Sequence, residues 1–215
     1  MPRPNLIVLN RATNLRLENI TLQNSPKFHF VPTECAGVVI SNVTVLAPSG
    51  AANTDAIDPS NCRQVLITKC LIDVGDDNIA IKAGKPVEGR EFACEDITVT
   101  DCTFLHGHGM SIGSETAGNV RIVLVNNCTF ENTENGIRIK SQRGKGGLVG
   151  RSGKGTPKEI RLHLAPAQLD RPQPGHQPAD GKYHAAKFTE ISFRPDRVRG
   201  RGHLQRHRAG PFGRG

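Results

Sequence analysis

A repeated pattern of apolar alternation runs through the first 140 residues and restricts the fold more than any other feature. It is clear in the strings LRLENITLQN, VVISNVTVLA, VLITKCLIDV, ITVTDCTFLH and IVLVNNCTFE. Each string places a small apolar residue after a polar one, and these apolar residues are Ile20, Val43, Cys70, Cys102 and Cys128. Their separations of 23, 27, 32 and 26 residues are typical of a solenoid, whose units bury their apolar sides against one another.

The residues around these positions predict strands. Apolar and polar residues alternate, β-branched side chains dominate, and no apolar residues recur at the spacing of a helix. A second alternation follows in the later repeats, at residues 79–82, 110–113 and 137–140. We therefore predict an all-β fold, a parallel β-helix with about five recognisable coils. The alternative is a β-sandwich, which would need hairpin turns every 8–12 residues or so without a long regular period.

Polar residues and cysteines recur at matching places of the repeats. The polar residues that can form tight bends and hydrogen-bond along the stack are Asn19, Asn42, Lys69, Asp101 and Asn127. The six cysteines are Cys35, Cys62, Cys70, Cys94, Cys102 and Cys128. Three of them occupy equivalent repeat positions, which favours buried free thiols, although an even number also permits disulfides. None forms a CxxC pair, so we expect no zinc site.

The net charge of +8 comes from the C-terminal part of the chain. Residues 1–140 contain 12 Lys and Arg against 15 Asp and Glu, whereas residues 141–215 contain 16 against 5. The acidic first part argues against a phosphate-backbone partner, so nucleic acid could bind only the basic segment. No window of about 18 apolar residues occurs and no signal-peptide pattern opens the chain. We therefore expect no membrane partner, and either an intracellular protein or a chain that begins inside a longer one.

The regular pattern stops after about Gly144, so we divide the chain at this point. Residues 1–145 are predicted to form a β-helix catalytic fragment, and residues 146–215 a basic tail rich in Gly, Pro and Arg. The 13 Gly and 7 Pro of residues 141–215 predict disorder; the alternatives are a tail that binds RNA or another anionic partner, and a loss of the natural reading frame. Within the β-helix, residues 85–95 are expected to form a surface loop between coils.

The pair Asp76-Asp77, in the string GDDNIAIK, is the strongest candidate for chemistry. Adjacent carboxylates repel each other, and neither can fill a core. Asp76 and His108 each lie six residues after the repeated cysteine of their coil, which places them on neighbouring coils about 4.8 Å apart. Asp55 lies one coil earlier. These four residues are therefore predicted to gather on one face.

Two basic residues follow one coil after the histidine. Arg138 and Lys140 alternate with isoleucines, so their side chains leave the same side of a strand. An Arg fork pairs well with a carboxylate, which indicates an acidic sugar as ligand. Crowded carboxylates raise the pKa of one member, and that member can donate a proton to a leaving oxygen. Carboxylates one or two coils apart suit the separation of roughly 6.5–9.5 Å that an inverting glycosidase needs around its water.

Each motif alone also has an ordinary explanation. Gly-Asp-Asp occurs in solvated turns, Asn-Thr-Asp caps turns, Gly-His-Gly is a weak signal, and Arg-x-Lys often forms a solvated face. Their order within one repeat frame favours function. For the nearby Asp58, Asp73 and Glu115 we expect structural roles, and His29 is a candidate wall of the substrate groove.

At these residues the chain resembles the polygalacturonase family of pectin-hydrolysing enzymes. The family's four signatures stand here as Asn53-Thr54-Asp55, Gly75-Asp76-Asp77, Gly107-His108-Gly109 and Arg138-Ile139-Lys140, in the family's order. The resemblance covers about residues 1–145 and implies a right-handed parallel β-helix that hydrolyses α-1,4-galacturonan with inversion.

The resemblance also implies roles for individual residues. It makes Asp76 the general acid, Asp55 and Asp77 the carboxylates that activate water, and His108 the residue that keeps the acid's protonation in order. Asn53 and Gly107 join Arg138 and Lys140 as the expected substrate-binding residues. It further implies no metal or other cofactor, a monomer, pectin or polygalacturonate as partner, and an extracellular or periplasmic location.

The chain departs from the family in two ways. Ala56 stands where the family usually has Gly, which adds a methyl beside Asp55 and is expected to narrow the cleft. The family has further coils before Asn5 and after Lys140, so we expect impaired activity and an exposed strand edge. Residues 85–95 and the string HGHGMSIGSE resemble exo-acting members. The alternatives are an inactive fragment or a non-catalytic polysaccharide-binding β-helix, and a pectate lyase.

Overall fold

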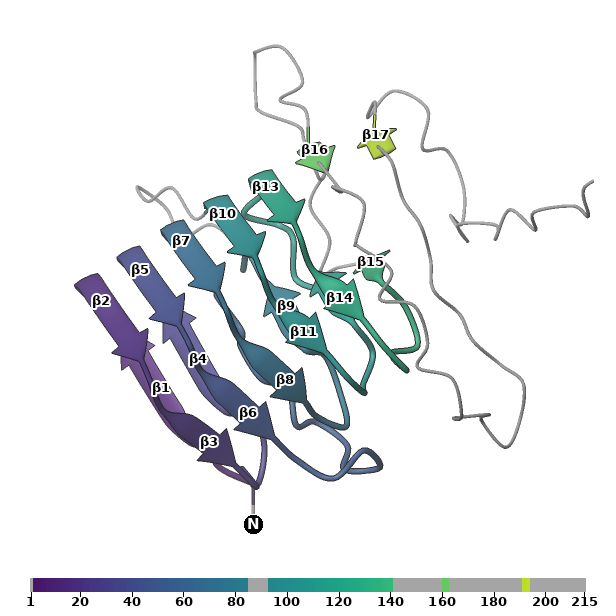
Figure 1. Ribbon diagram of the computed structural model, residues 1–215. Coiled ribbons are helices and arrows are strands. Elements are labelled where there is room, and N and C mark those ends of the chain that lie inside the picture. Colours follow the sequence, from purple (N-terminus) through teal and green to yellow (C-terminus); the bar gives the residue numbers. More distant parts are fainter. Residues whose placement is uncertain (1, 85–92, 141–159, 163–190, 194–215) are drawn as a thin grey trace, which may run out of the picture.

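The computed structural model describes residues 2–84, 93–140, 160–162 and 191–193. These residues contain strands and turns only, wound into a stack of coils (Figure 1). Within the same ranges, no helix is long and apolar enough to cross a membrane.

Two five-stranded parallel sheets form two faces of the stack. The first has the order β13-β10-β7-β5-β2 and the second the order β14-β11-β8-β6-β3. The strands of the first are β2 (Thr13–Glu18), β5 (Ala36–Ser41), β7 (Arg63–Thr68), β10 (Cys94–Thr100) and β13 (Val120–Asn126). Those of the second are β3 (Thr21–Gln23), β6 (Thr44–Leu46), β8 (Leu71–Asp73), β11 (Thr103–Phe104) and β14 (Thr129–Phe130).

A third parallel face carries the candidate site. It comprises the pair β1 (Ile7–Asn10) and β4 (Phe30–Thr33), and the sheet β9 (Ile79–Ile81), β12 (Met110–Ile112) and β15 (Ile137–Ile139). Single bridges from Phe30 to Ile57 and from Ile57 to Ile79 join the two parts. The described residues also include a separate antiparallel pair, β16 (Ile160–Leu162) and β17 (Ile191–Phe193).

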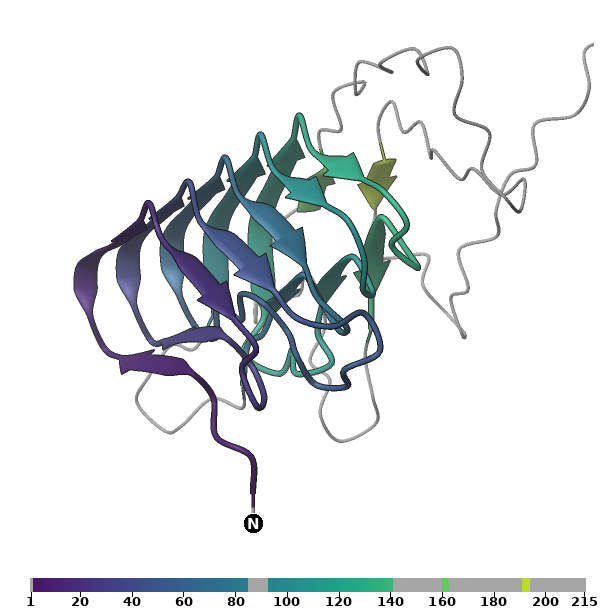
Figure 2. The ribbon, with the colours of Figure 1, turned by 60° about the horizontal axis from the view of Figure 1, so that its bottom comes forward.

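The chain visits the three faces in turn, so each strand pairs with its equivalent in the next coil. Figure 2 shows these coils side by side, with the strands of each face in parallel rows. Every pairing within the three faces is parallel, and the repeated residues match as the sequence pattern requires: Leu71 pairs with Thr103, and Thr103 with Thr129. The predicted all-β parallel β-helix of about five coils is confirmed, and the β-sandwich is excluded.

The bends between the first and second faces are formed by the predicted polar residues. All five have a positive φ, between 48° and 58°, and they are Asn19, Asn42, Lys69, Asp101 and Asn127. Asn and Asp tolerate this left-handed conformation better than most residues. The amide of Asn42 donates to Asn19 Oδ1 at 2.8 Å, so the side chains also bond from coil to coil.

The residue after each bend points into the core in the interior coils. Val43, Cys70 and Cys102 are buried, whereas Cys128 is half-buried and Ile20, in the first coil, is exposed. All six cysteines are free thiols, which confirms the prediction made for the three at equivalent repeat positions, Cys70, Cys102 and Cys128. The positions therefore select small apolar side chains because each stacks on its equivalent in the next coil.

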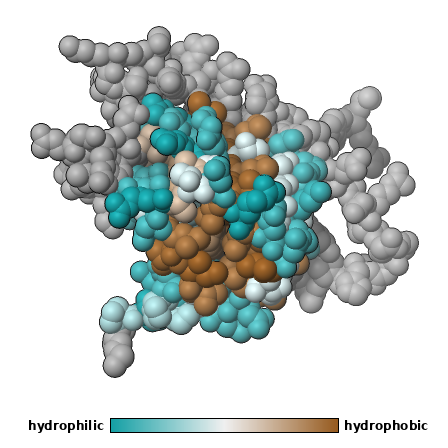
Figure 3. Space-filling view, turned by 90° about the vertical axis from the view of Figure 1, so that its left-hand side faces the viewer, coloured by the Kyte–Doolittle hydropathy of each residue, from teal (hydrophilic) through white to brown (hydrophobic). Residues whose placement is uncertain are grey.

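The core runs along the axis of the stack and consists mainly of Ile and Val. Aromatic stacking continues it toward the last coil, where the rings of Phe104 and Phe130 have centroids 4.7 Å apart. At the N-terminal end, seen in Figure 3, apolar side chains of the first coil form part of the surface. Leu6 and Val8 are each 46% exposed there.

Two sequence-based expectations fall wholly or partly outside the described residues. Of the loop expected at residues 85–95, residues 85–92 lie outside, and the end of the expected loop is wrong because β10 already begins at Cys94. Of the tail at 146–215, only β16 and β17 are described, so its predicted disorder stays a prediction.

Candidate active site

The candidate site lies along the third face, at and just before Ile57, β9, β12 and β15. The pairing of Ile79 with Met110, extended back by two residues, places Asp77 opposite His108. Counting from the repeated cysteines places Asp76 opposite His108, one residue away from this register, but the predicted proximity of Asp76 and His108 is confirmed, with 3.1 Å between Oδ1 and Nδ1. Eight positions separate Leu71 from Ile79, but only seven separate Thr103 from Met110. The extra residue before β9 allows both Asp76 and Asp77 to face the site.

The Asp76 carboxylate is held by backbone donors. Its Oδ2 accepts from the N–H of Asn53 at 2.9 Å, and its Oδ1 from the N–H of Asp77 at 2.9 Å. Thr54 fixes the preceding residue, because its hydroxyl accepts from the N–H of Gly75 at 3.0 Å. The side chain of Asp76 remains 21% exposed, so a ligand bound on this face can reach it.

Asp77 is the buried centre of an ion network. Its side chain is 1% exposed, and its two oxygens accept from Arg138 at 2.6 Å and from Lys140 at 2.5 Å. Ser111 donates to the same carboxylate at 2.8 Å and accepts from Arg138 Nε at 3.2 Å. Burial opposes ionisation of Asp77, but these hydrogen bonds and the charges of Lys140 and Arg138 outweigh it and lower the pKa of the carboxyl.

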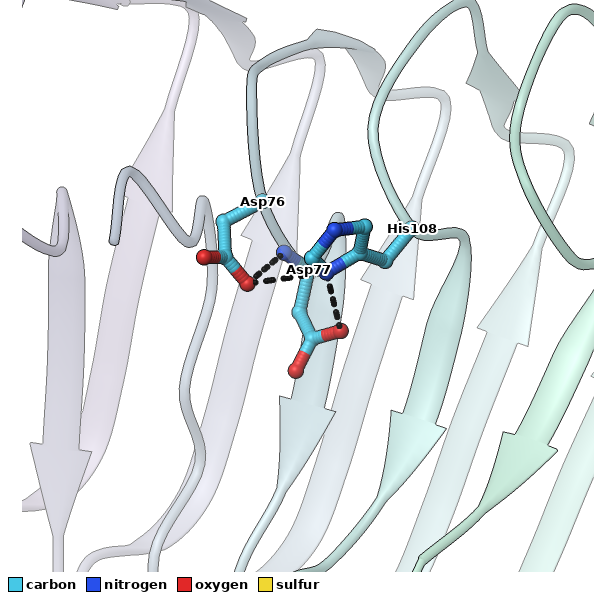
Figure 4. Close-up of side chains that lie close together, drawn as sticks. All are labelled: Asp76, Asp77 and His108. Carbon is cyan, nitrogen blue, oxygen red and sulfur yellow. Dashed lines mark hydrogen bonds and ion pairs between the residues drawn. The ribbon is translucent and has the colours of Figure 1, made fainter. Parts of the chain in front are cut away.

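His108 lies between the two adjacent acids (Figure 4). Its Nδ1 is 3.1 Å from Asp76 Oδ1 and 3.7 Å from Asp77 Oδ1. Neither approach has the alignment of a hydrogen bond, so this buried nitrogen has no hydrogen-bond partner in the described part of the chain. On the other side of the ring, Nε2 lies 3.6 Å from Glu134. A positive charge on the His108 ring would thus reduce the repulsion between the two carboxylates.

Glycine beside His108 is required by a close backbone approach. Gly107 has φ +92°, and a Cβ built there would lie 2.3 Å from the carbonyl oxygen of Asp76. The N–H of His108 donates to that same carbonyl at 2.9 Å. Gly107 therefore brings the histidine coil into contact with the Asp76 coil, which accounts for it without any contact to a substrate.

Asp55 is nearly buried, and its environment differs from that of the other two acids. Burial raises its pKa to about 6; Lys82 opposes the rise, and the charges of Asp76 and Asp77 add to it. Lys82 Nζ lies 3.5 Å from Asp55 Oδ2 and forms a closer ion pair with Asp58. The surroundings of these two carboxyls thus move their pKa values apart, raising that of Asp55 and lowering that of Asp77.

No metal site is indicated by the chemistry of this cluster. One donor atom each of Asp76, Asp77 and His108 lies within 4.8 Å of the others, which is close enough to share an ion. Both oxygens of Asp77, however, already pair with Arg138 and Lys140, whose charges repel a cation. The expected absence of a metal stays a prediction.

Most of the predicted site residues meet in the structure. Asp55, Asp76, Asp77 and His108 lie on consecutive coils, and Arg138 and Lys140 reach back to Asp77 from the coil after His108. Asn53 contributes its backbone N–H, not a side chain, to Asp76.

Two expectations about the groove are wrong. His29 is fully buried, so it is no groove wall. Its Nε2 accepts from the N–H of Ser25, which leaves Nδ1 to donate to the carbonyl of Asp55 at 3.1 Å. Burial lowers the pKa of the ring, in keeping with this neutral form. The methyl of Ala56 is also fully buried and packs in the core, so it does not narrow the cleft.

Sequence patterns missed three residues that support the site. Ser111 joins the Asp77 network, and its signal was a polar residue between two apolar ones in register with Arg138. Asn78 accepts from the N–H of Gly109 at 2.9 Å and donates to the carbonyl of His106 at 2.8 Å. Lys82 ends the alternation at residues 79–82, but its pattern pointed to no function.

The fold and this cluster define a class: a parallel β-helix that carries an acidic cluster and adjacent cations on one face. Residues 2–151 match the family described as Glycosyl hydrolases family 28. An endo-polygalacturonase of Pectobacterium carotovorum subsp. carotovorum is 43% identical over 146 residues, covering 68% of this chain and 35% of that protein. A polygalacturonase of Juniperus ashei is 39% identical over 151 residues, covering 68% and 28%.

Solved structures agree. The polygalacturonase from Erwinia carotovora ssp. carotovora has a TM-score of 0.64 at 43% identity, covering 68% of this chain and 38% of that one. The exopolygalacturonase from Thermotoga maritima has a TM-score of 0.61 at 35% identity, covering 65% and 32%. The chain belongs to glycosyl hydrolase family 28, and it spans about a third of the length of these relatives.

Proposed function

We propose that the chain hydrolyses α-1,4-galacturonosyl bonds in pectin or polygalacturonate, with inversion at the anomeric carbon. The observation that carries the proposal is the juxtaposition of Asp55, Asp76 and Asp77 with Arg138 and Lys140 on one face. The relatives named polygalacturonase support this substrate class.

Three different roles follow from the surroundings of the carboxylates. Asp76 is the most exposed of the three, so it is the one that can donate a proton to the leaving oxygen. At least one oxygen of Asp77 lies within 4.8 Å of Asp76, less than the roughly 6.5–9.5 Å that an inverting pair keeps around a water. Asp55 is therefore the base that activates the water.

Asp77 organises the cations rather than taking part in proton transfer. Its two oxygens are occupied by Arg138 and Lys140, and its pKa is lowered. The cations are 28% and 34% exposed in their side chains, and each has further N–H donors beyond those used by Asp77. These free donors are available to the carboxylate of a galacturonate unit.

Other functions have less support. A pectate lyase would depend on calcium-binding acids and an arginine base, whereas Arg138 here is paired with Asp77. A non-catalytic polysaccharide-binding β-helix would release no reducing ends from polygalacturonate. Since relatives named endo- and exo-acting are both similar, the mode of cleavage is a matter for product analysis.

Release of reducing ends from polygalacturonate tests the proposal. The purified chain is expected to release them from polygalacturonate and much more slowly from fully methyl-esterified pectin, because esterification removes the charge that Arg138 and Lys140 bind. The products should show no new ultraviolet absorbance. Absorbing, unsaturated products would mean a lyase, and no products from a folded sample would reject hydrolysis by this chain. A monomeric, extracellular or periplasmic protein is part of the same proposal.

A further inference from the structure

Lys82 lies between two buried carboxylates at the back of the site. Its Nζ forms an ion pair with Asp58 and lies 3.5 Å from Asp55 Oδ2. The ring of Phe28 covers the ammonium group, with its centroid 4.3 Å from Nζ. The side chain of Lys82 is 18% exposed and that of Asp58 only 1%, so water screens these charges weakly.

Lys82 is the cation nearest to Asp55 in the described ranges. Arg138 and Lys140 are both engaged by Asp77, on the neighbouring coil. Three acids surround Asp55: Asp76 and Asp77 on the coil that also carries Lys82, and Asp58 on its own segment. Glu115 of the following coil acts on Lys82, and neutral His29 contacts only the backbone carbonyl of Asp55. The ionisation of Asp55 therefore depends on how closely Lys82 pairs with Asp55 rather than with Asp58.

Asp58 pairs with Lys82 through only one of its two carboxylate oxygens. Its Oδ1 is buried without a hydrogen-bond partner in the described residues, while its Oδ2 pairs with Lys82. A buried charge left half unsatisfied is destabilising, so a purely structural site would favour an apolar residue here. Burial raises the pKa of Asp58, and the charge of Asp55 raises it further. Protonation of Asp58, or its replacement by a neutral side chain, would leave Lys82 paired with Asp55 alone.

We infer that Lys82 and Asp58 are positioning residues that together set the ionisation of Asp55: Lys82 holds the Asp55 carboxylate in its charged form, and Asp58 competes for Lys82. The inference rests on the proposed role of Asp55 as base. It adds two side chains that do not touch the reacting atoms. Its distinguishing consequence is that replacing Lys82 and replacing Asp58 must shift the titration midpoint of Asp55 in opposite directions.

Carboxyl carbon NMR of aspartate-labelled protein measures this directly, with the Asp55 signal assigned by its loss in Asp55→Asn. In Lys82→Met the titration midpoint of Asp55 is expected to rise by about one pH unit, because a cation 3.5 Å from its carboxylate is removed. In Asp58→Asn the midpoint is expected to fall, because Lys82 then pairs with Asp55 only. Lys69→Met is the matched control, since exposed Lys69 lies at the bend between β7 and β8. The titration midpoint of Asp55 in this control should equal that in the wild type.

Midpoints that stay unchanged in both variants, or that move in the same direction, would overturn the inference. If Lys82→Met does not fold, Asp58→Asn still decides, because it keeps the lysine and its fall in midpoint is specific. The measurement needs no turnover. Opposite shifts in a chain that releases no reducing ends would uphold this inference and reject the proposed function, and unchanged midpoints in an active chain would do the reverse.

Discussion

Replacing Asp76 with Asn is expected to lower kcat on polygalacturonate by roughly 10²–10⁴-fold, the usual contribution of a general acid. The amide cannot donate a proton to the leaving oxygen, yet it keeps the shape of the side chain. It can still accept at its oxygen from one of the two backbone donors, Asn53 or Asp77. Folding should therefore change little. The measurement is the steady-state rate of reducing-end release by wild type and variant.

A substrate with an activated leaving group separates the acid from the base. Galacturonosyl fluoride needs little protonation of its leaving group, so Asp76→Asn is expected to recover much of its rate on it. Asp55→Asn is expected to stay slow on both substrates, because water activation is still needed. Asp101→Asn is the control for an exposed acid away from the site, at the bend between β10 and β11. Equal losses for Asp76→Asn on both substrates would remove Asp76 from the role of acid.

Replacing Asp55 with Asn is expected to stabilise the folded chain relative to the wild type, and this gain should grow as the pH rises. The folded pKa of Asp55 is about 6, above its ordinary value of 3.8. Between these values the folded state binds more protons than the unfolded state, so the contribution of Asp55 to stability is complete below about pH 4 and is lost as the pH rises through about 6. The loss is about 3 kcal/mol at neutral pH. Asn at this position does not titrate and avoids it.

Urea unfolding at several pH values measures this difference. The free energy of unfolding of Asp55→Asn minus that of the wild type is expected to grow by about 3 kcal/mol between about pH 4 and about pH 7. Titrating groups that do not interact with Asp55 are present in both proteins and cancel in the difference. Asp101→Asn should show no such growth. A difference that is constant with pH, or that shrinks as the pH rises, would show that burial does not raise the pKa of Asp55.

The coil architecture could be predicted from sequence because each repeated position has one physical requirement. The bends need residues that tolerate a positive φ, such as Asn19 and Asp101, and the next position needs a small apolar side chain, such as Val43 or Cys102. These requirements are local and recur with every coil. The strand edges were harder to predict, as at Cys94, because an alternating pattern does not show where a loop ends.

The site could be predicted as a set of residues but not as a geometry. Counting from the cysteines correctly made Asp76 and His108 neighbours, but it missed the register by one residue, because a single extra residue precedes β9. Burial could not be read from the pattern either, so His29 and Ala56 were assigned to the groove. The ion pair of Lys82 with Asp58 joins residues on different coils, and only the register makes them neighbours.

The stereochemistry of the first product tests the central claim most directly. Proton NMR can follow the anomeric signal of new reducing ends while the chain acts on oligogalacturonates, before the sugar mutarotates. The division of roles between Asp76 as acid and Asp55 as base of a single displacement predicts that the β-anomer appears first. The α-anomer appearing first would mean a covalent intermediate on a nearby carboxylate, and it would contradict the assignment of the two acids.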